Sequence, residues 1–112
     1  MSSQLYVLKD QKVFTEPDVM KWSKWYEVAA HRIVKQEWVE NIWVSTVFLG
    51  LNHNFLRRGP PVLWETMTFS NIKEWDRNCW RCPGTWEQAE AQHNKVVSQA
   101  KKYLVKHKPN KG

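Results

Sequence analysis

Two strand-like segments on either side of a short polar stretch most constrain what this chain can fold into. Residues 42–51 (IWVSTVFLGL) and 62–69 (VLWETMTF) are rich in β-branched and aromatic side chains, which favour extended backbone. Residues 52–60 between them are polar and basic and contain a glycine, so they predict a loop. Because short connections favour antiparallel pairing, we expect the two segments to lie side by side in one sheet.

The segments before residue 42 predict further strands and one helix. Residues 5–14 predict a small hairpin, and residues 32–39 predict a strand of the main sheet. Residues 16–30 predict a helix, with Thr15 as its N-cap and Asp18 bonding back to the cap. Apolar residues recur in this helix at helical spacing, namely Val19, Trp22, Tyr26, Ala29 and Ala30.

The C-terminal part of the chain predicts an irregular segment and a second helix. Residues 70–84 predict irregular structure, and Thr85 with Gln88 forms a capping box for the helix that follows. The apolar face of that helix should pack on the sheet. The elements together predict one α+β domain over residues 1–106, with an antiparallel sheet of three to five strands and two helices packed against it. The expected order is roughly β-α-β-β-β-α, followed by a basic tail over residues 107–112.

The basic charge of the chain is concentrated at its C-terminal end. The net charge is +6, and five of the 17 basic residues follow residue 100, namely Lys101, Lys102, Lys106, Lys108 and Lys111. Residues 1–100 therefore hold 12 basic and 11 acidic residues and are nearly neutral. Such an end is typical of a solvated tail, and an arm that attracts phosphate is the alternative.

Composition indicates a soluble globular protein. The apolar fraction is 42%, the mean hydropathy is −0.66, and no stretch approaches the ~20 apolar residues of a membrane helix. The N-terminal Met-Ser-Ser-Gln has neither a basic start nor an apolar stretch, so we expect no secretory signal, no membrane partner and a cytosolic location. Eight tryptophans predict either a core filled with bulky side chains or an aromatic-lined site.

The segment from Trp43 to Phe69, WVSTVFLGLNHNFLRRGPPVLWETMTF, resembles a family of small uncharacterised proteins encoded by tailed phages. The family pattern is close to VSTVFLGLDHNF, followed by GPPxLFETMVF and by a Thr-Trp-Glu-Glu-Ala helix. Residues 44–55, 59–69 and 85–93 fit this layout, although Asn52 stands where the family has Asp. The resemblance implies a phage origin and an accessory role in the infected cell, and it implies no reaction.

The loop between the two strongest strands concentrates candidate ligand-binding residues. It contains His53, Arg57 and Arg58, and two guanidinium groups beside a glycine can bind phosphate or carboxylate bidentately. Glu65 lies on the next strand among apolar residues of the same face, so its carboxylate is expected to need a partner. That partner is either a loop residue, which makes a structural ion pair, or a bound polar ligand.

Trp64 and His93 complete the candidate ligand-binding set. Trp64 offers an aromatic contact next to Glu65 in the sequence. His93 lies on the apolar face of the last helix, where it is either a hydrogen-bonded core residue or a pocket residue beside His53 and Glu65. The sequence therefore leaves open whether these side chains meet in one site.

The Cys79-Trp80-Arg81-Cys82 motif is a single C-x-x-C in a segment expected to be irregular. A structural zinc site requires four ligands, and a second pair of ligands with suitable spacing is absent from the sequence. Free thiols, a local disulfide and a metal site are the three alternatives. We expect no metal and no other cofactor.

Three hypotheses of function follow from these features. The first is a non-enzymatic phage accessory protein in the host cytoplasm, which binds a host protein or a small polar ligand and inhibits a host process such as anti-phage defence. The second is a nucleic-acid-binding protein that uses Trp faces and the Lys tail, although its body is nearly neutral. The third is a small hydrolase or transferase around His53, Glu65 and His93, but no nucleophile accompanies them and no catalytic residue is assigned.

We predict that the C-terminal tail is dispensable for folding. Few apolar residues follow Leu104 and Val105, and Pro109 and Gly112 oppose a helix. Deletion of residues 107–112 should change the free energy of unfolding by less than about 0.5 kcal/mol, as surface changes remote from packing do. Urea denaturation measures this change, and a larger loss would mean that the tail packs on the domain.

Overall fold

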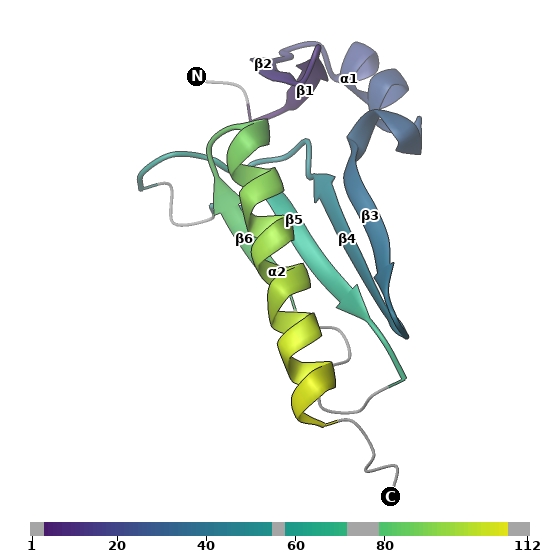
Figure 1. The fold of residues 1–112 in the computed structure, drawn as a ribbon. Helices are drawn as coiled ribbons and strands as arrows, with labels where there is room; N and C mark the ends of the chain where they lie inside the picture. The colour runs from purple at the N-terminus through teal and green to yellow at the C-terminus, as the bar shows by residue number, and fades with distance from the viewer. Residues whose placement is uncertain (1–3, 55–57, 72–78, 108–112) are drawn as a thin grey trace, which may run out of the picture.

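The computed structural model describes residues 4–54, 58–71 and 79–107, and every structural statement below concerns these residues (Figure 1). They form an α+β fold, as the sequence predicts. The elements in chain order are β1 (Tyr6–Lys9), β2 (Lys12–Thr15), α1 (Val19–Tyr26), the 3-10 helix η1 (Ala29–Arg32), β3 (Ile33–Val39), β4 (Ile42–Phe48), β5 (Val62–Phe69), β6 (Cys79–Pro83) and α2 (Trp86–Lys106).

The main sheet has four antiparallel strands in the order β3-β4-β5-β6. The strongest sequence expectation is confirmed, because β4 and β5 pair antiparallel from Trp43 opposite Phe69 to Phe48 opposite Trp64. A turn at Glu40 and Asn41 joins β3 to β4, and Glu40 has a φ of 53°. The strands therefore run as a simple meander, since each is bonded to its neighbour in the chain.

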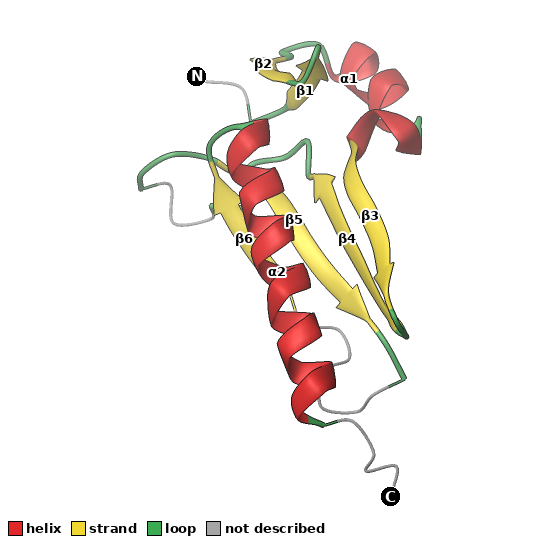
Figure 2. Cartoon of the chain, viewed as in Figure 1, coloured by secondary structure: helices red, strands yellow, loops and turns green. Residues whose placement is uncertain are grey.

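Helix α2 lies diagonally across one face of this sheet (Figure 2). Its capping box is present as the sequence predicts, with the Thr85 hydroxyl accepting from the Gln88 backbone and the Gln88 side chain accepting from the Thr85 backbone. The helix contacts all four strands of the sheet. Its buried residues recur every three or four positions, which puts them on one side of the helix: Ala89, His93, Val96, Val97 and Ala100.

Two apolar clusters fill the space between α2 and the sheet. Val39, Ile42 and Val44 pack with the second half of α2, and Phe48, Leu63 and Trp64 pack near its start. The Trp64 and Phe48 ring centroids lie 4.9 Å apart. Burial of such large side chains accounts for part of the high tryptophan content, because each removes much apolar area from water.

Helix α1 lies at one end of the main sheet rather than across its face (Figure 1). It packs on β1, and the Trp22 indole nitrogen donates to the Tyr6 and Gly50 carbonyl oxygens at 3.1 and 3.2 Å. The Trp25 ring meets Phe48 edge-on at 5.9 Å. The β1–β2 hairpin and α1 together close this end of the core.

The expected start and length of the first helix are wrong. Thr15 is the last residue of β2, where it pairs with Tyr6, so it cannot cap the helix. Asp18 is the N-cap instead, because its side chain accepts from the backbone of Met20 and Lys21. The helix ends at Tyr26, and the expected residues 29–30 belong to η1.

The expectation of irregular structure over residues 70–84 is also wrong in part. Residues 79–83 form β6, which pairs with β5 from Met67 opposite Cys79 to Val62 opposite Pro83. The segment lacks a strong strand pattern, so its extended state depends on the long neighbouring strand that it pairs with. The observed order is therefore β-β-α-β-β-β-β-α.

We predict that Thr85→Ala lowers the free energy of unfolding by about 1 kcal/mol, because it removes the hydroxyl that caps α2. The matched control is Thr15→Ala, the same change at the position where the sequence wrongly suggests a cap. The control should lose less than half as much in urea denaturation. Equal losses for the two variants would contradict the assigned cap.

Candidate functional site

Glu65 has its partner within the sheet. It lies opposite Arg81 of β6, and the Arg81 Nε donates to the Glu65 Oε2 at 2.8 Å. The Cys79 thiol also lies near this oxygen, at 3.4 Å. The sequence left this partner open between a residue of the His53 loop and a bound ligand, but the register of β5 and β6 places Arg81 directly across from Glu65. The Glu65 carboxylate is thus stabilised by a cross-strand ion pair with Arg81.

The candidate loop residues lie at the end of the sheet near β1. The His53 backbone donates to the Val62 carbonyl at 2.8 Å, and the Asn52 side-chain oxygen accepts from the backbone of Asn54 and Val62 at 2.8 and 3.0 Å. Asn52 therefore closes the described part of the loop through an Asx turn. Arg58 is exposed, and Arg57 lies outside the described residues.

Trp64 is a core residue. Its side chain is fully buried, and its indole nitrogen donates to the Gly84 carbonyl oxygen at 2.8 Å. It belongs to the opposite face of β5 from Glu65, because adjacent strand residues point to opposite sides. Trp64 therefore positions the turn before α2 and does not present its ring to a ligand.

His93 lies at the centre of a polar chain between α2 and the sheet. Its Nδ1 is 2.7 Å from the Thr46 hydroxyl, and its Nε2 is 2.8 Å from the Glu37 Oε2. The Thr46 hydroxyl is 2.6 Å from that of Thr66, which accepts from the Gln92 side chain at 3.1 Å. His93, Thr46 and Thr66 are all fully buried. Five side chains thus connect the buried interface to its rim at Glu37.

The direction of these hydrogen bonds follows from which groups can donate. The Gln92 Nε2 can only donate and the Glu37 carboxylate can only accept, which fixes both ends of the chain. A neutral His93 then donates from Nε2 to Glu37 and accepts at Nδ1 from Thr46, while Thr66 donates to Thr46. The Thr46 and Thr66 hydroxyls then each donate one hydrogen bond and accept another. A second proton on His93 would make Nδ1 a donor, so Thr46 could no longer donate to it and the directions of the other hydrogen bonds would have to change.

The pKa values agree with a neutral His93 beside an ionised Glu37. Burial lowers the pKa of His93, although its hydrogen bond to Glu37 acts in the opposite direction. The same hydrogen bond lowers the pKa of Glu37, with a further contribution from Lys35, whose Nζ is 3.6 Å away. The order of Thr46, His93 and Glu37 resembles a catalytic triad, but the hydroxyl is buried and hydrogen-bonded to Thr66. The arrangement therefore binds the helix to the sheet.

The face of the main sheet opposite α2 is here called the outer face. Alternation along paired strands assigns to it Ile33, Gln36 and Trp38 of β3, Trp43, Ser45 and Val47 of β4, Glu65, Met67 and Phe69 of β5, and Cys79 and Arg81 of β6. Three aromatic residues form a row across adjacent strands, because Trp38 is opposite Trp43 and Trp43 is opposite Phe69. Trp38 is 64% exposed and Phe69 is 42% exposed.

The outer face combines large apolar side chains with few charged ones. Its charged strand residues in the described part of the chain are Glu65 and Arg81, which form an ion pair with each other. The Trp38 and Trp43 rings lie 5.1 Å apart and tilt by 52°, so each supports the other. Large aromatic side chains exposed side by side on a rigid sheet are typical of a binding surface.

The two cysteines lie on opposite faces of the sheet. Cys79 is exposed and belongs to the outer face, whereas Cys82 packs against the cluster around Trp64. Burial raises the pKa of both thiols, and the nearby Glu65 carboxylate raises that of Cys79 further. This geometry supports two free thiols and argues against a metal or a disulfide shared by the pair.

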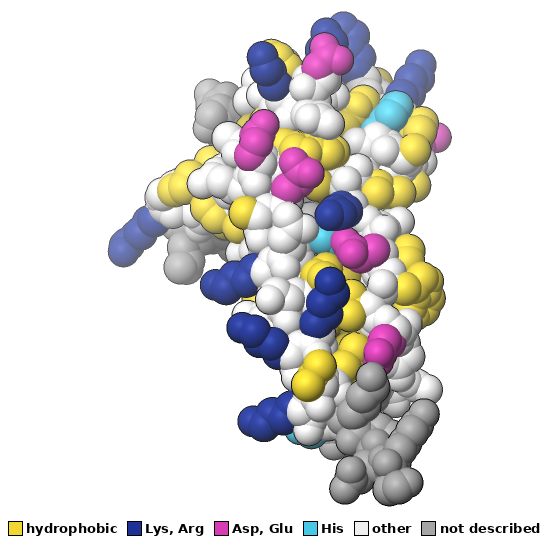
Figure 3. Space-filling model, viewed as in Figure 1, with side chains coloured by type: hydrophobic (Ala, Val, Ile, Leu, Met, Phe, Trp, Pro, Cys, Tyr) yellow, Lys and Arg dark blue, Asp and Glu magenta, His cyan; other side chains and the backbone are white. Residues whose placement is uncertain are grey.

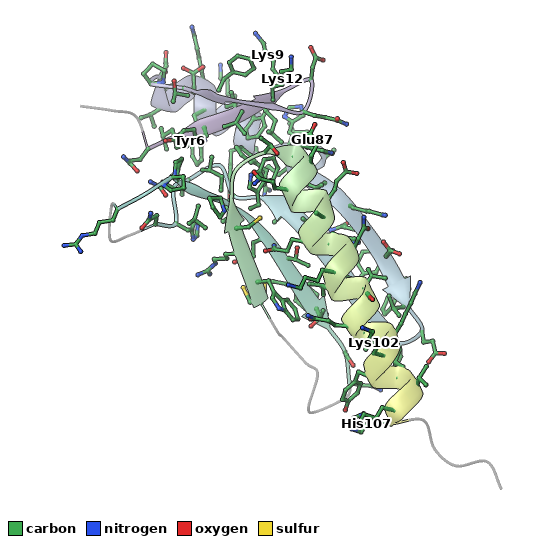
Figure 4. All side chains as sticks on the ribbon, turned by 60° about the vertical axis from the view of Figure 1, so that its left-hand side comes forward. Tyr6, Lys9, Lys12, Glu87, Lys102 and His107 are labelled. Carbon is green, nitrogen blue, oxygen red and sulfur yellow. The ribbon has the colours of Figure 1, made fainter. Side chains whose placement is uncertain are left out.

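Lysines follow the solvent side of α2 in its second half. Figure 3 shows Lys and Arg side chains along the helix and apolar side chains at the β3 side of the molecule. Glu87 lies near the start of α2, whereas Lys102 and His107 lie near its end (Figure 4). This distribution suits the helix dipole, which favours acidic groups at the N-terminus and basic groups at the C-terminus. The dipole accounts for Lys106 in the last turn of α2, whereas the preceding lysines are exposed side chains on the side of the helix away from the sheet.

The structure does not bring the predicted site residues together. Glu65 is on the outer face, His93 and Trp64 lie beneath α2, and the described loop residues are at the end of the sheet. Sequence reasoning missed the outer aromatic row. A signal for it was present, since Trp38 and Trp43 flank a two-residue turn and must share one face of a tight hairpin.

No protein-family model matches the chain, and no curated protein and no solved structure matches it either. No helix in the described part of the chain is long and apolar enough to cross a membrane.

We predict that His93 makes stability fall as the pH drops below about 6.5, the value for an unfolded histidine. Because the folded pKa is lowered, the unfolded chain binds the proton first, so acid favours unfolding. The contribution is at most about 1.4 kcal/mol per pH unit. Urea denaturation of the native protein and His93→Gln should show a steeper loss between pH 7 and pH 5 for the native protein.

Parallel pH profiles for the two proteins would contradict a neutral buried His93. Glu37 does not obscure this comparison, because its folded pKa is also lowered. Its stabilisation is fully present above the unfolded value of 4.5 and is lost only at lower pH.

Proposed function

We propose that this chain is a non-enzymatic binding protein that engages another protein through the outer face. The row of Trp38, Trp43 and Phe69 carries this proposal. Aromatic residues dominate the energy of protein interfaces, since they bury a large area at low entropic cost. A sheet holds them rigidly, so little order has to be gained on binding.

The charge of the outer face favours a protein over nucleic acid. Stacking surfaces for single-stranded nucleic acid combine aromatic residues with cations that neutralise phosphates. Among the described residues of this face the cation is Arg81, and it already forms an ion pair with Glu65. The lysines of α2 project from the opposite side of the sheet, where they cannot act together with the aromatic row.

The positions of the titratable groups argue against a hydrolase or transferase around His53, Glu65 and His93. Glu65 and His93 lie on opposite faces of the sheet, so one substrate could not contact both. His93 is fully buried and both of its ring nitrogens are hydrogen-bonded. A general acid or base must reach the proton that it transfers.

The resemblance of the central segment to small tailed-phage proteins suggests what kind of protein is bound. In that setting the partner is a host protein met in the cytoplasm of the infected cell. Binding would inhibit a host process such as anti-phage defence. This part of the proposal rests on the resemblance, whereas the choice of surface rests on the aromatic row.

We predict that Phe69→Glu abolishes partner binding, because it places a charge at the end of the aromatic row. The matched control is Phe14→Glu, the same change at a residue of β2 that is 48% exposed, close to the 42% of Phe69. A pull-down from lysate of the infected host, quantified by mass spectrometry, should give a host protein retained by the native chain and the control. Its recovery with Phe69→Glu should fall about tenfold or more.

Equal recovery with the two variants would remove the outer face from the interaction. Recovery that depends on nucleic acid, and that disappears after nuclease treatment, would favour the nucleic-acid alternative. Both variants must keep the native circular dichroism spectrum for the comparison to count.

A further inference from the structure

Strand β3 is an edge of the main sheet, and its sequence is self-complementary. The order of strands leaves one side of β3 without a described neighbour. Its seven residues, Ile33–Val39, read IVKQEWV. Apolar residues lie at both ends, Lys35 and Glu37 flank the centre, and Gln36 is the midpoint. A strand with this pattern can pair antiparallel with a copy of itself.

We propose that β3 pairs with β3 of a second copy of this chain across a two-fold axis at Gln36. The two sheets would join into one continuous sheet of eight strands. Backbone hydrogen bonds along an open edge provide the affinity in such strand addition, and side chains set the register. This interface uses the edge of the sheet; it shares Trp38 with the outer face, but its formation does not require the partner proposed for that face.

Charge sets the register. With Gln36 opposite Gln36 of the second copy, Lys35 lies opposite Glu37 of the second copy, and the reverse pair forms by symmetry. Within one chain the Lys35 Nζ already lies 3.6 Å from the Glu37 Oε2. The four side chains then alternate in sign both along and across the strands, which stabilises an antiparallel pair. A shift of one residue would lose both cross-strand pairs.

The apolar residues at the two ends of β3 also fit a two-fold axis at Gln36. The register of β3 against β4 shifts between Ile33 and Lys35, so Val34 is the extra residue of a bulge and Ile33 belongs to the outer face. The axis therefore brings Ile33 beside Trp38 of the second copy on a common face. These residues are 38% and 64% exposed, and the pairing would cover both.

A hollow at one end of β3 gives further room for the second copy. It has a volume of about 410 Å³ and is lined by Trp38, Val39, Glu40, Lys101, Leu104 and Val105. The two-fold axis places the N-terminal end of β3 in one copy beside the C-terminal end of β3 in the other. The segment that precedes β3 in one copy therefore approaches this hollow in the other. Val28, directly before η1, is exposed and apolar and belongs to that segment.

Disulfide trapping tests the axis. In a chain with Cys79→Ser and Cys82→Ser, the added change Gln36→Cys places the two new thiols directly opposite each other, within about 5.5 Å between Cα atoms. The matched control, Trp38→Cys, lies on the same face two residues away; because Trp38 itself contacts the second copy, sedimentation equilibrium of the reduced variant must show that it still dimerises. Its two thiols would be four residues of strand apart, about 13 Å, which no disulfide spans. Mild oxidation should cross-link Gln36→Cys at least tenfold more than the control.

Sedimentation equilibrium tests the charge pairing without any cysteine. Lys35→Glu puts two carboxylates opposite each other on both sides of the axis and should weaken the dimer about tenfold or more. The matched control, Lys102→Glu, makes the same change on the solvent side of α2 and should leave the dimer unchanged. Circular dichroism confirms that both variants fold.

Three results would overturn the proposal. The first is a monomer at every concentration together with no cross-link at Gln36→Cys. The second is equal cross-linking of Gln36→Cys and Trp38→Cys, which would mean random collision or another interface. The third is a dimer that Lys35→Glu leaves unchanged.

Discussion

The packing of α2 across one face of the four-stranded sheet is the interaction on which the rest of the structure depends. Apolar contacts supply most of its free energy, since Ile42, Val44 and Phe48 are removed from water together with the buried side of the helix. The hydrogen bonds of His93 add specificity, because a helix shifted along the sheet would leave Thr46, Thr66 and His93 buried without partners.

A single covering helix gives the two faces of the sheet different roles. The inner face is sealed by α2 and holds the buried polar chain, whereas the outer face keeps exposed aromatic side chains and one ion pair. The strand order also leaves β3 at an edge. The surfaces proposed for binding, the outer face and the β3 edge, both exist because the chain has one long helix and an open sheet.

Much of the fold could be predicted from the sequence where local patterns are strong. Strand β5 was placed at its observed bounds, and the Thr85 capping box marked the start of α2. Weak local patterns failed. Thr15 was a plausible cap by residue type, but the β1–β2 pairing holds it in a strand, and β6 forms because β5 offers it a partner. For the candidate site, the sequence predicted that the Glu65 carboxylate needs a partner. It did not predict that the partner is Arg81.

The sequence by itself determined the fold class, the β4–β5 pairing and the amphipathic face of α2, because these follow from residue spacing within an element and from the short connection between two strong strands. Only the tertiary structure decided which groups meet. It separated Glu65 from His93, joined His93 to Glu37 over 56 positions in the chain, and aligned Trp38, Trp43 and Phe69 in one row. The physical reason is that register and helix placement depend on packing between elements, which no local pattern contains.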